Sequence, residues 1–369
     1  MIKKYTACLV ILFSMLMPCF SMAFETNAKY AILMDYDTSE ILYDKNANSS
    51  MHPSSMTKLM TVYVVFEHLQ KGILHLEDKF RVSEKSWRTG GSKMFLNHRD
   101  RVTVEQLLNG IIVQSGNDAC IAMAEGISSS EEAFVELMNK TSQRIGLEGS
   151  VFKNTTGLPD EGHVMTAKDI AVLSANIIKN FPKYYEYFSK QEYSYGGIKQ
   201  KNRNLLLYDE MNVDGLKTGH TDDGGYGIAV SAKQDGRRLI AVVNGLASEI
   251  ERAEEARRLL IYGFRYFDNK TFYDAGDVVA NADIWYGADE NVPLVTKEKI
   301  NLPVPKLDES NIKIEVLYNG PLHAPVKQGD EVGILKINIP NMPEKSFPLY
   351  ASKDVSKMGL FKRIIKNLF

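Results

Sequence analysis

The chain has 369 residues, of which 44% are hydrophobic and 24% charged, so composition gives no sign of wholesale disorder and the length suits two or three domains. The 44 Lys and Arg against 46 Asp and Glu give a formal net charge of −2, which argues against a basic protein that coats nucleic acid. With only three cysteines, the chain is not a disulfide-stapled scaffold.

The first 23 residues have the pattern of a secretory signal peptide. Lys3 and Lys4 precede an apolar run at 7–17, and residues 21–23 (Ser-Met-Ala) offer small side chains for cleavage. The apolar run is too short to favour the alternative, an uncleaved anchor helix that crosses a bilayer. We therefore expect export and removal of residues 1–23, after which Cys120 is the one remaining cysteine and serves packing.

The body of the chain alternates hairpins and helices. Apolar-rich stretches on either side of 37–39 predict one β-hairpin, and stretches on either side of 234–236 predict another. Helical periodicity, caps and acidic first turns predict helices at 56–70, 104–113, 131–145, 166–180 and 253–267. This order predicts an α+β fold, with one antiparallel sheet made by the early and late hairpins and flanked by helices from the middle of the chain.

From about residue 269 the character of the sequence changes. Asp, Gly, Pro and Asn recur at short intervals between strand-like runs at 312–318 and 331–339, which predicts a small all-β domain. In the basic end, 352–369, five Lys and Arg stand against one Asp. Its apolar residues fall on one helix face and suit an anionic membrane surface, whereas the alternative is a terminal helix packed on its own domain.

The first chemical motif is Ser55-Met56-Thr57-Lys58. A helix that begins near Met56 places Ser55 and Lys58 on one side of its first turn. A serine hydroxyl needs a neighbouring base to become a nucleophile, and a lysine can be that base once burial lowers its pKa. Alone, the motif also fits a helix cap followed by a surface lysine.

The second motif, Ser115-Gly116-Asn117, separates two apolar helical stretches. A hydroxyl there can relay protons and an amide can bind a substrate peptide bond, although an ordinary interhelical turn has the same pattern.

The third motif, Lys217-Thr218-Gly219-His220, precedes the second hairpin. Lys and Thr on a strand edge can bind a carboxylate, and Gly219 would let a substrate backbone approach; the alternative is a strand and a polar turn.

Together the three motifs match the Ser-x-x-Lys, Ser-x-Asn and Lys-Thr-Gly set of penicillin-binding proteins and class A β-lactamases. Segments 53–60, 114–120 and 212–221 extend the match. The chain resembles the low-molecular-mass penicillin-binding proteins that are D-alanyl-D-alanine carboxypeptidases, peptidase family S11. The resemblance covers about 30–267 closely and implies a penicillin-binding protein/serine β-lactamase-like domain.

The resemblance also implies roles for individual residues. Ser55 is expected to be the acylated nucleophile, Lys58 its base and Ser115 a proton relay. A second group is expected to bind the substrate: Asn117, Lys217, Thr218, Gly219, His220 and Arg252. Within it, Asn117 also orients Lys58, and Arg252 reinforces carboxylate binding. The backbone amides of Ser55 and His220 are expected to form the oxyanion hole. No metal and no cofactor is expected.

The expected organisation is a signal peptide at 1–23, a serine peptidase domain at 24–268, a β-rich domain at 269–350 and an amphipathic anchor helix at 351–369. The expected partners are the peptidoglycan stem pentapeptide, β-lactam antibiotics as covalent inhibitors, and an anionic membrane surface through 352–369, but no nucleic acid. The protein would be periplasmic and held peripherally on the inner membrane.

Several activities fit the same motifs. A class A β-lactamase needs an extra Glu on a dedicated loop, and the sequence around Glu131 and Glu161 does not match one. A non-catalytic β-lactam sensor needs a transmembrane signalling segment, and a transpeptidase differs only in the nucleophile that resolves the acyl-enzyme. The stretch Lys85–Leu96 looks shorter than the corresponding loop of well-known members, which puts the deacylation rate in question.

Overall fold

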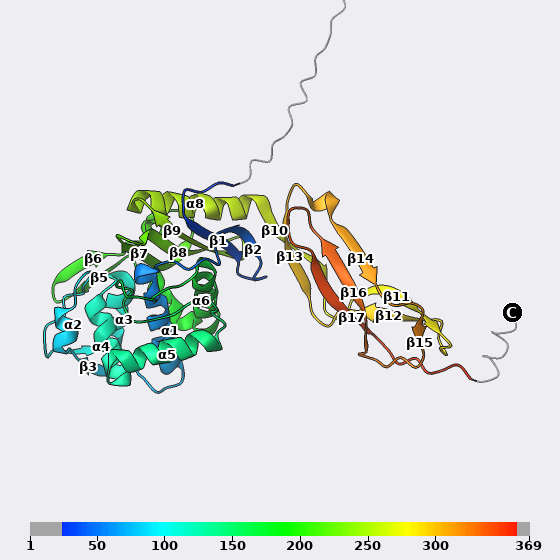
Figure 1. Cartoon of the computed structure of the whole chain (residues 1–369), viewed down its shortest axis with the longest axis horizontal. Helices are drawn as coiled ribbons and strands as arrows, with labels where there is room; N and C mark the ends of the chain where they lie inside the picture. Colours follow the sequence, from blue (N-terminus) through cyan, green and yellow to red (C-terminus); the bar gives the residue numbers. More distant parts are fainter. Residues whose placement is uncertain (1–23, 360–369) are drawn as a thin grey trace, which may run out of the picture.

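A computed structural model describes residues 24–359, so the predicted signal peptide and the last ten residues lie outside the described part. Figure 1 shows a helix-and-sheet unit followed by an elongated β module. The helix α8 (Glu249–Tyr266) connects these two units. Side-chain contacts join the units directly, among them a hydrogen bond that Asn269 donates to the Asp35 carboxylate at 3.1 Å and an ion pair between Lys345 and Glu40 at 2.6 Å.

The first unit is built on a five-stranded antiparallel sheet of order β2-β1-β9-β8-β7. Its strands are β1 (Tyr30–Asp35), β2 (Ile41–Lys45), β7 (Val213–Thr221), β8 (Gly225–Gln234) and β9 (Arg237–Leu246). The early and late hairpins therefore do form one sheet, as predicted, because β1 pairs with β9. β7, which carries the third motif, is an edge strand.

Both faces of this sheet are covered. Along β1, Ala31 and Leu33 pack in the cluster that includes α8, whereas Ile32 and Met34 pack in the cluster of the other helices. Figure 1 shows α8 on one face and the remaining helices on the other. α8 begins four residues before the predicted start, because the Ser248 hydroxyl caps it by accepting from the Glu251 amide.

The helices on the second face enclose a large apolar core that includes most of α1. The elements between β2 and β7 are the 3₁₀ helices η1 (Ser54–Thr57), η2 (Glu186–Ser189) and η3 (Leu205–Tyr208), the helices α1 (Lys58–Gln70), α2 (Glu84–Arg88), α3 (Val104–Val113), α4 (Asn117–Ser128), α5 (Glu131–Arg144), α6 (Ala167–Asn180) and α7 (Pro182–Tyr185), and the strand pairs β3 (Lys79–Arg81) with β4 (Arg101–Thr103) and β5 (Glu192–Tyr195) with β6 (Ile198–Lys201).

The β module has a six-stranded sheet of order β14-β16-β17-β12-β11-β15 and a separate pair, β10 with β13, around its own apolar core. Its elements are β10 (Phe267–Tyr273), β11 (Val278–Trp285), β12 (Asn291–Val295), β13 (Ile300–Pro305), η4 (Glu309–Asn311), β14 (Lys313–Leu317), β15 (Leu322–His323), β16 (Glu331–Asn338) and β17 (Lys345–Ala351). The change from helix to strand falls between Tyr266 and Phe267, two residues before the predicted boundary.

The predicted terminal helix does not begin at residue 351. β17 runs through Ala351, and the chain then continues without helix along the β module, where Val355 bridges Val326 and Lys357 bridges Gly287. Residues 360–369, which carry most of the amphipathic pattern, lie outside the described residues. Within the described part, no helix is long and apolar enough to cross a membrane.

Candidate active site

Ser55 lies in η1, a single 3₁₀ turn that leads directly into α1. The sequence predicts one helix from Met56, whereas the structure has this turn first and α1 from Lys58. The turn brings Lys58 Nζ to 2.9 Å from Ser55 Oγ. Ser55 is partly exposed while Lys58 is fully buried, so a hydroxyl open to a ligand meets an amine shielded from water.

Lys58 has no carboxylate among its hydrogen-bond partners. Besides Ser55, its Nζ donates to Asn117 Oδ1 at 2.8 Å and to the Thr156 carbonyl at 2.6 Å. Burial lowers the pKa of Lys58 to about 8. About a tenth of the side chain is therefore a neutral amine at pH 7, with a lone pair available to take the Ser55 proton.

The second motif lies where α3 ends and α4 begins. Ser115 is buried with φ +58°, and its Oγ has no hydrogen-bond partner among the described residues. Asn117 is held by two loop contacts, from its Nδ2 to the Gly90 carbonyl and from its amide to the Ser92 carbonyl. With its Nδ2 held there, the Oδ1 of Asn117 accepts from Lys58, which is the orienting contact that the resemblance implies.

β7 carries the third motif and packs against η1, the nucleophile turn that contains Ser55. Lys217 and Thr218 are almost fully buried, and Lys217 Nζ donates to the Thr218 carbonyl at 3.1 Å. A Cβ on Gly219 would lie 2.9 Å from the Pro53 carbonyl oxygen and 3.2 Å from Ser54 Cβ. The packing of β7 against the turn therefore leaves little room for a Cβ at this position, and the substrate approach expected from the sequence stays a prediction.

His220 and Arg252 meet through an aromatic ring. His220 is exposed and stacks on Tyr226 of β8 with 3.9 Å between ring centroids. The buried guanidinium of Arg252, on α8, lies 5.7 Å from the centroid of the same ring and donates to the Arg203 carbonyl at 3.1 Å. The structure thus places Arg252 beside the third motif, behind Tyr226.

The site is electropositive. Burial lowers the pKa of Lys217 well below its usual value, and the nearby charges of Lys58, Arg203 and Arg252 lower it further. Among these four cations, the one ion pair in the described residues joins Arg252 to Glu249 at 3.7 Å. A cluster of cations with so little counter-charge suits an anionic ligand such as a carboxylate.

Comparison with known proteins agrees with this geometry. Residues 18–248 match the family model described as D-alanyl-D-alanine carboxypeptidase, and residues 267–357 match the C-terminal domain of penicillin-binding protein 5. The chain belongs to the D-alanyl-D-alanine carboxypeptidase family. It is 38% identical to D-alanyl-D-alanine carboxypeptidase DacD of Escherichia coli (strain K12), over 92% of this chain and 90% of that protein.

Solved structures of family members share the fold. Penicillin-binding protein 5 from Haemophilus influenzae aligns with a TM-score of 0.80 and 35% identity, over 91% of this chain and 99% of that one. Penicillin-binding protein D2 from Listeria monocytogenes, in its ampicillin-bound form, aligns with a TM-score of 0.60 and 27% identity, over 66% of this chain and 99% of that one. The match to the Haemophilus protein includes the β module, as its coverage of both chains requires.

Sequence reasoning misses several residues of this family site. The Thr156 carbonyl, which accepts from Lys58, is a backbone atom and leaves no signal in the sequence. Arg203 donates to Ser92 Oγ at 2.7 Å, and Ser54 Oγ lies 2.8 Å from Thr221 Oγ1 at the end of β7. Ser54 and Thr221 adjoin the first and third motifs in the sequence, so a search next to the motifs would have found them. No motif lies near Arg203 in the sequence, so nothing there marks it.

The structure gives Glu131 a supporting position. Its carboxylate accepts from the Thr155 amide and hydroxyl, at 3.0 and 2.8 Å, and pairs with Lys85 at 3.0 Å. It therefore holds the loop that presents the Thr156 carbonyl. Glu161 lies exposed on the same segment. Neither contact pattern marks a base for fast deacylation.

The 85–96 stretch is tied closely to the second motif. The amides of Met94 and Leu96 donate to the two carboxylate oxygens of Asp118, and Ser86 Oγ donates to the backbone carbonyl of Asp118.

Cys120, on the same helix as Asp118, is a free and buried thiol, and burial raises its pKa to about 12. It stays protonated and packs as an apolar group.

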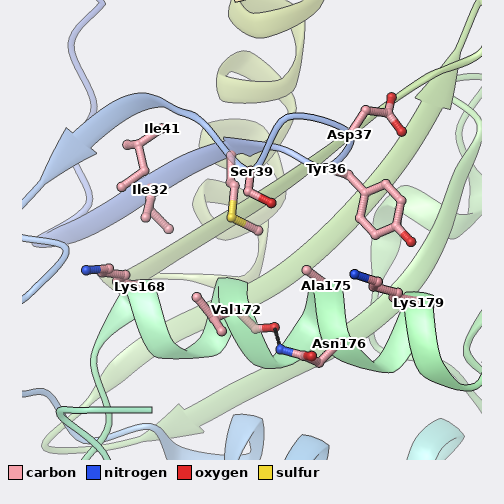
Figure 2. Close-up of a pocket in the computed structure, with 11 residues that line it drawn as sticks. Ile32, Tyr36, Asp37, Ser39, Ile41, Lys168, Val172, Ala175, Asn176 and Lys179 are labelled. Carbon is pink, nitrogen blue, oxygen red and sulfur yellow. Dashed lines mark hydrogen bonds between the residues drawn. The ribbon is translucent and has the colours of Figure 1, made fainter. Parts of the chain in front are cut away.

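A separate cavity of about 410 Å³ lies between α6 and the β1–β2 hairpin. Figure 2 shows its lining, with Val172 and Ala175 on the helix opposite Ile32 and Tyr36. None of the motif residues line it. Within the residues that the structure describes, no group of His, Cys, Asp and Glu side chains could hold a metal ion.

Proposed function

We propose that this chain is a serine carboxypeptidase that removes the terminal D-Ala from peptidoglycan pentapeptides, with Ser55 as the nucleophile. The observation that carries the proposal is the 2.9 Å contact between Ser55 Oγ and the buried Lys58 Nζ, in a chain of the D-alanyl-D-alanine carboxypeptidase family. Burial keeps the amine partly neutral, so a base stands beside the hydroxyl.

In the acylation step, neutral Lys58 takes the Ser55 proton as Oγ attacks the carbonyl carbon of the penultimate D-Ala. The backbone amides of Ser55 and His220 stabilise the oxyanion. As the tetrahedral intermediate collapses, the peptide C–N bond breaks and the leaving nitrogen takes a proton through Ser115, whose buried hydroxyl is free to relay it. Terminal D-Ala departs as a free amino acid and the peptide stays esterified to Ser55.

Hydrolysis reverses these proton movements. Water gives a proton to Lys58 and attacks the ester carbonyl, after which Ser55 Oγ leaves and is reprotonated. Specificity for a C-terminal residue comes from the cationic pocket, in which Lys217 and Thr218 bind the terminal carboxylate and Arg252 supports them from behind Tyr226. A β-lactam carries a carboxylate and a reactive amide in similar positions, so it acylates Ser55 and stays bound.

The test is acylation of the wild type and of Ser55→Ala by a fluorescent penicillin, with D-Ala release from a pentapeptide analogue measured in parallel. We expect the variant to lose both activities completely. Either activity retained in the variant would exclude Ser55 as the nucleophile. The lifetime of the benzylpenicillin adduct, followed by mass spectrometry, separates this function from a β-lactamase, which would clear the adduct rapidly.

We also propose that the protein is exported to the periplasm and rests on the inner membrane through its C-terminal residues. The basic amphipathic pattern of 360–369 supports this, and so does its position directly after the β module. Deletion of 360–369 spares Lys357 and Met358, which contact the β module. The truncated protein should leave the membrane fraction with catalysis unchanged, and unaltered membrane partition would refute the anchor.

A further inference from the structure

His163 is a buried side chain behind the nucleophile turn that the catalytic steps do not use. Its Nε2 lies 2.8 Å from Thr57 Oγ1, and the Lys153 amide donates to its Nδ1 at 3.2 Å. Because Nδ1 accepts a hydrogen bond, the neutral ring carries its proton on Nε2. His163 therefore donates to the Thr57 hydroxyl.

Thr57 is the last residue of η1, between Ser55 and the start of α1, so this hydrogen bond reaches the turn itself. The segment 152–163 makes two more contacts here, one with the first residue of α1 and one with the turn. The Thr156 carbonyl accepts from Lys58, and the α-carbon of Gly157 lies so close to the Ser54 carbonyl that a Cβ would overlap it. The turn is thus held between this segment on one side and β7 on the other.

We propose that His163 is a positioning residue for acylation, which fixes the Ser55 and Lys58 pair from behind through its hydrogen bond to Thr57. The proposal rests on Ser55 being the nucleophile. The carboxylate pocket is made by β7 and α8, and His163 has no hydrogen bond to either element. Loss of the His163 bond should therefore slow the covalent step without weakening the initial binding of a ligand.

The buried position of His163 keeps this donor in place. Burial lowers the pKa of His163 to about 4; Asp160 opposes this shift, whereas His52, Lys58 and Lys153 add to it. Asp223, from the turn after β7, lines a small pocket together with His163. The ring is therefore neutral throughout the pH range in which Lys58 can act as a base, and its Nε2–H remains directed at Thr57.

The experiment is a double-mutant cycle on acylation by benzylpenicillin at pH 8, with Thr57→Val, His163→Leu and the pair combined. Stopped-flow traces give the acylation rate constant and the dissociation constant of the preceding complex separately. We expect each single variant to lower the rate constant about tenfold, the size of one hydrogen bond, with the dissociation constant within twofold of wild type. The double variant should be no slower than the slower single variant, because both remove one interaction.

Two matched variants separate positioning from general stability. Thr57→Ser keeps the hydroxyl and should acylate at a rate near that of wild type. Phe152→Leu removes a ring that meets His163 edge-on at 6.0 Å but leaves the hydrogen bond, so it should lower the unfolding temperature without slowing acylation. If His163→Leu fails to fold, Phe152→Leu and Thr57→Val still test the proposal. Thr57→Val should slow acylation, whereas Phe152→Leu should leave the acylation rate unchanged.

Rate effects that add in the double variant would overturn the proposal, and so would an unchanged rate in Thr57→Val or equal slowing in Phe152→Leu. Ser55→Ala serves as the reference for the function itself. If Ser55→Ala is still labelled, the nucleophile assignment fails. If it is unlabelled and Thr57→Val acylates normally, only the role of His163 fails.

Discussion

The catalytic unit and the β module bury different kinds of side chain. The interior of the catalytic unit contains Lys58, Lys217 and Arg252 together with buried amides, hydroxyls and carboxylates, whereas Thr296 is the one buried polar side chain among the described residues of the module. Burial of polar and charged groups costs free energy unless they are hydrogen-bonded. The catalytic unit therefore carries a cost that the module avoids.

This difference separates residues that act in catalysis from residues that stabilise the fold. Lys58 satisfies its buried ammonium with three neutral oxygens, which hold it in place without the charge that would keep it protonated. The core of the module, by contrast, consists of alternating inward-facing aliphatic residues such as Leu335 and Ile337. Substitutions in the two regions should accordingly have opposite consequences.

Lys58→Met should produce the largest effect. Methionine has a similar length and apolar character, so it fills the buried site but cannot take the Ser55 proton. We expect acylation by benzylpenicillin to fall by at least about 10³-fold, with a thermal unfolding temperature equal to or above that of wild type, because a buried charge is removed. A variant that unfolds much earlier would show that Lys58 stabilises the fold and would remove the contrast with the module.

Gly157→Ala should damage both stability and activity. Gly157 has φ +80°, and a Cβ there would overlap the Ser54 carbonyl and lie 2.8 Å from Thr57 Oγ1. We expect a loss of more than about 3 kcal/mol in unfolding free energy and about a hundredfold slower acylation. Gly162→Ala is the matched control, since its φ is +75° but its Cβ would meet only the end of Lys153, at 3.4 Å. Equal losses in both variants would assign the effect to backbone strain alone.

Leu335→Ala tests the module in isolation from catalysis. Leu335 is fully buried on β16 in the apolar core of the module, and its truncation should cost about 2–5 kcal/mol through lost burial and the cavity left behind. We expect an earlier unfolding transition by calorimetry, while acylation at 25 °C stays within twofold of wild type. Slower acylation in the folded variant would mean that the module supports the active site.

Much of this fold was accessible from the sequence. The hairpins of the main sheet and the helix 104–113 follow from period-2 and period-3.6 patterns, and the structure has them within a residue or two. The short α2 was not predicted, because five residues with one buried side chain give no period. The start of α8 was missed because it depends on the Ser248 cap and not on an apolar face.

The candidate site was predictable in its side chains and not in its backbone. The sequence marks Ser55, Lys58 and Asn117 because each sits in a recognisable motif, and the same holds for Lys217. The structure places these side chains near one another. The Thr156 carbonyl depends on a loop closed by contacts distant in sequence, which no local pattern encodes. The close packing of Gly219 against Pro53 was likewise out of reach of the sequence, because it depends on how β7 meets the turn.

The pH dependence of acylation should give the smallest effect and the finest comparison. Lys58 must be neutral to accept the Ser55 proton, and burial sets its pKa at about 8. The neutral fraction falls tenfold for each pH unit below that value, so the acylation rate constant should fall about tenfold per unit between pH 7 and pH 6. About one pH unit above this pKa the base is almost fully neutral, and this rate constant should reach a plateau.

Initial binding should depend on pH in the opposite direction. The carboxylate pocket needs a protonated Lys217, whose pKa burial also lowers, so affinity for the unreacted ligand should weaken as pH rises through that pKa. Stopped-flow measurements from pH 6 to pH 10 separate the two limbs, and Lys217→Met should flatten only the binding limb. A rate constant that is flat between pH 6 and pH 8 would exclude Lys58 as the base. In that case Lys58 and Lys217 would only bind ligand, and no buried lysine of the catalytic unit would act as a base.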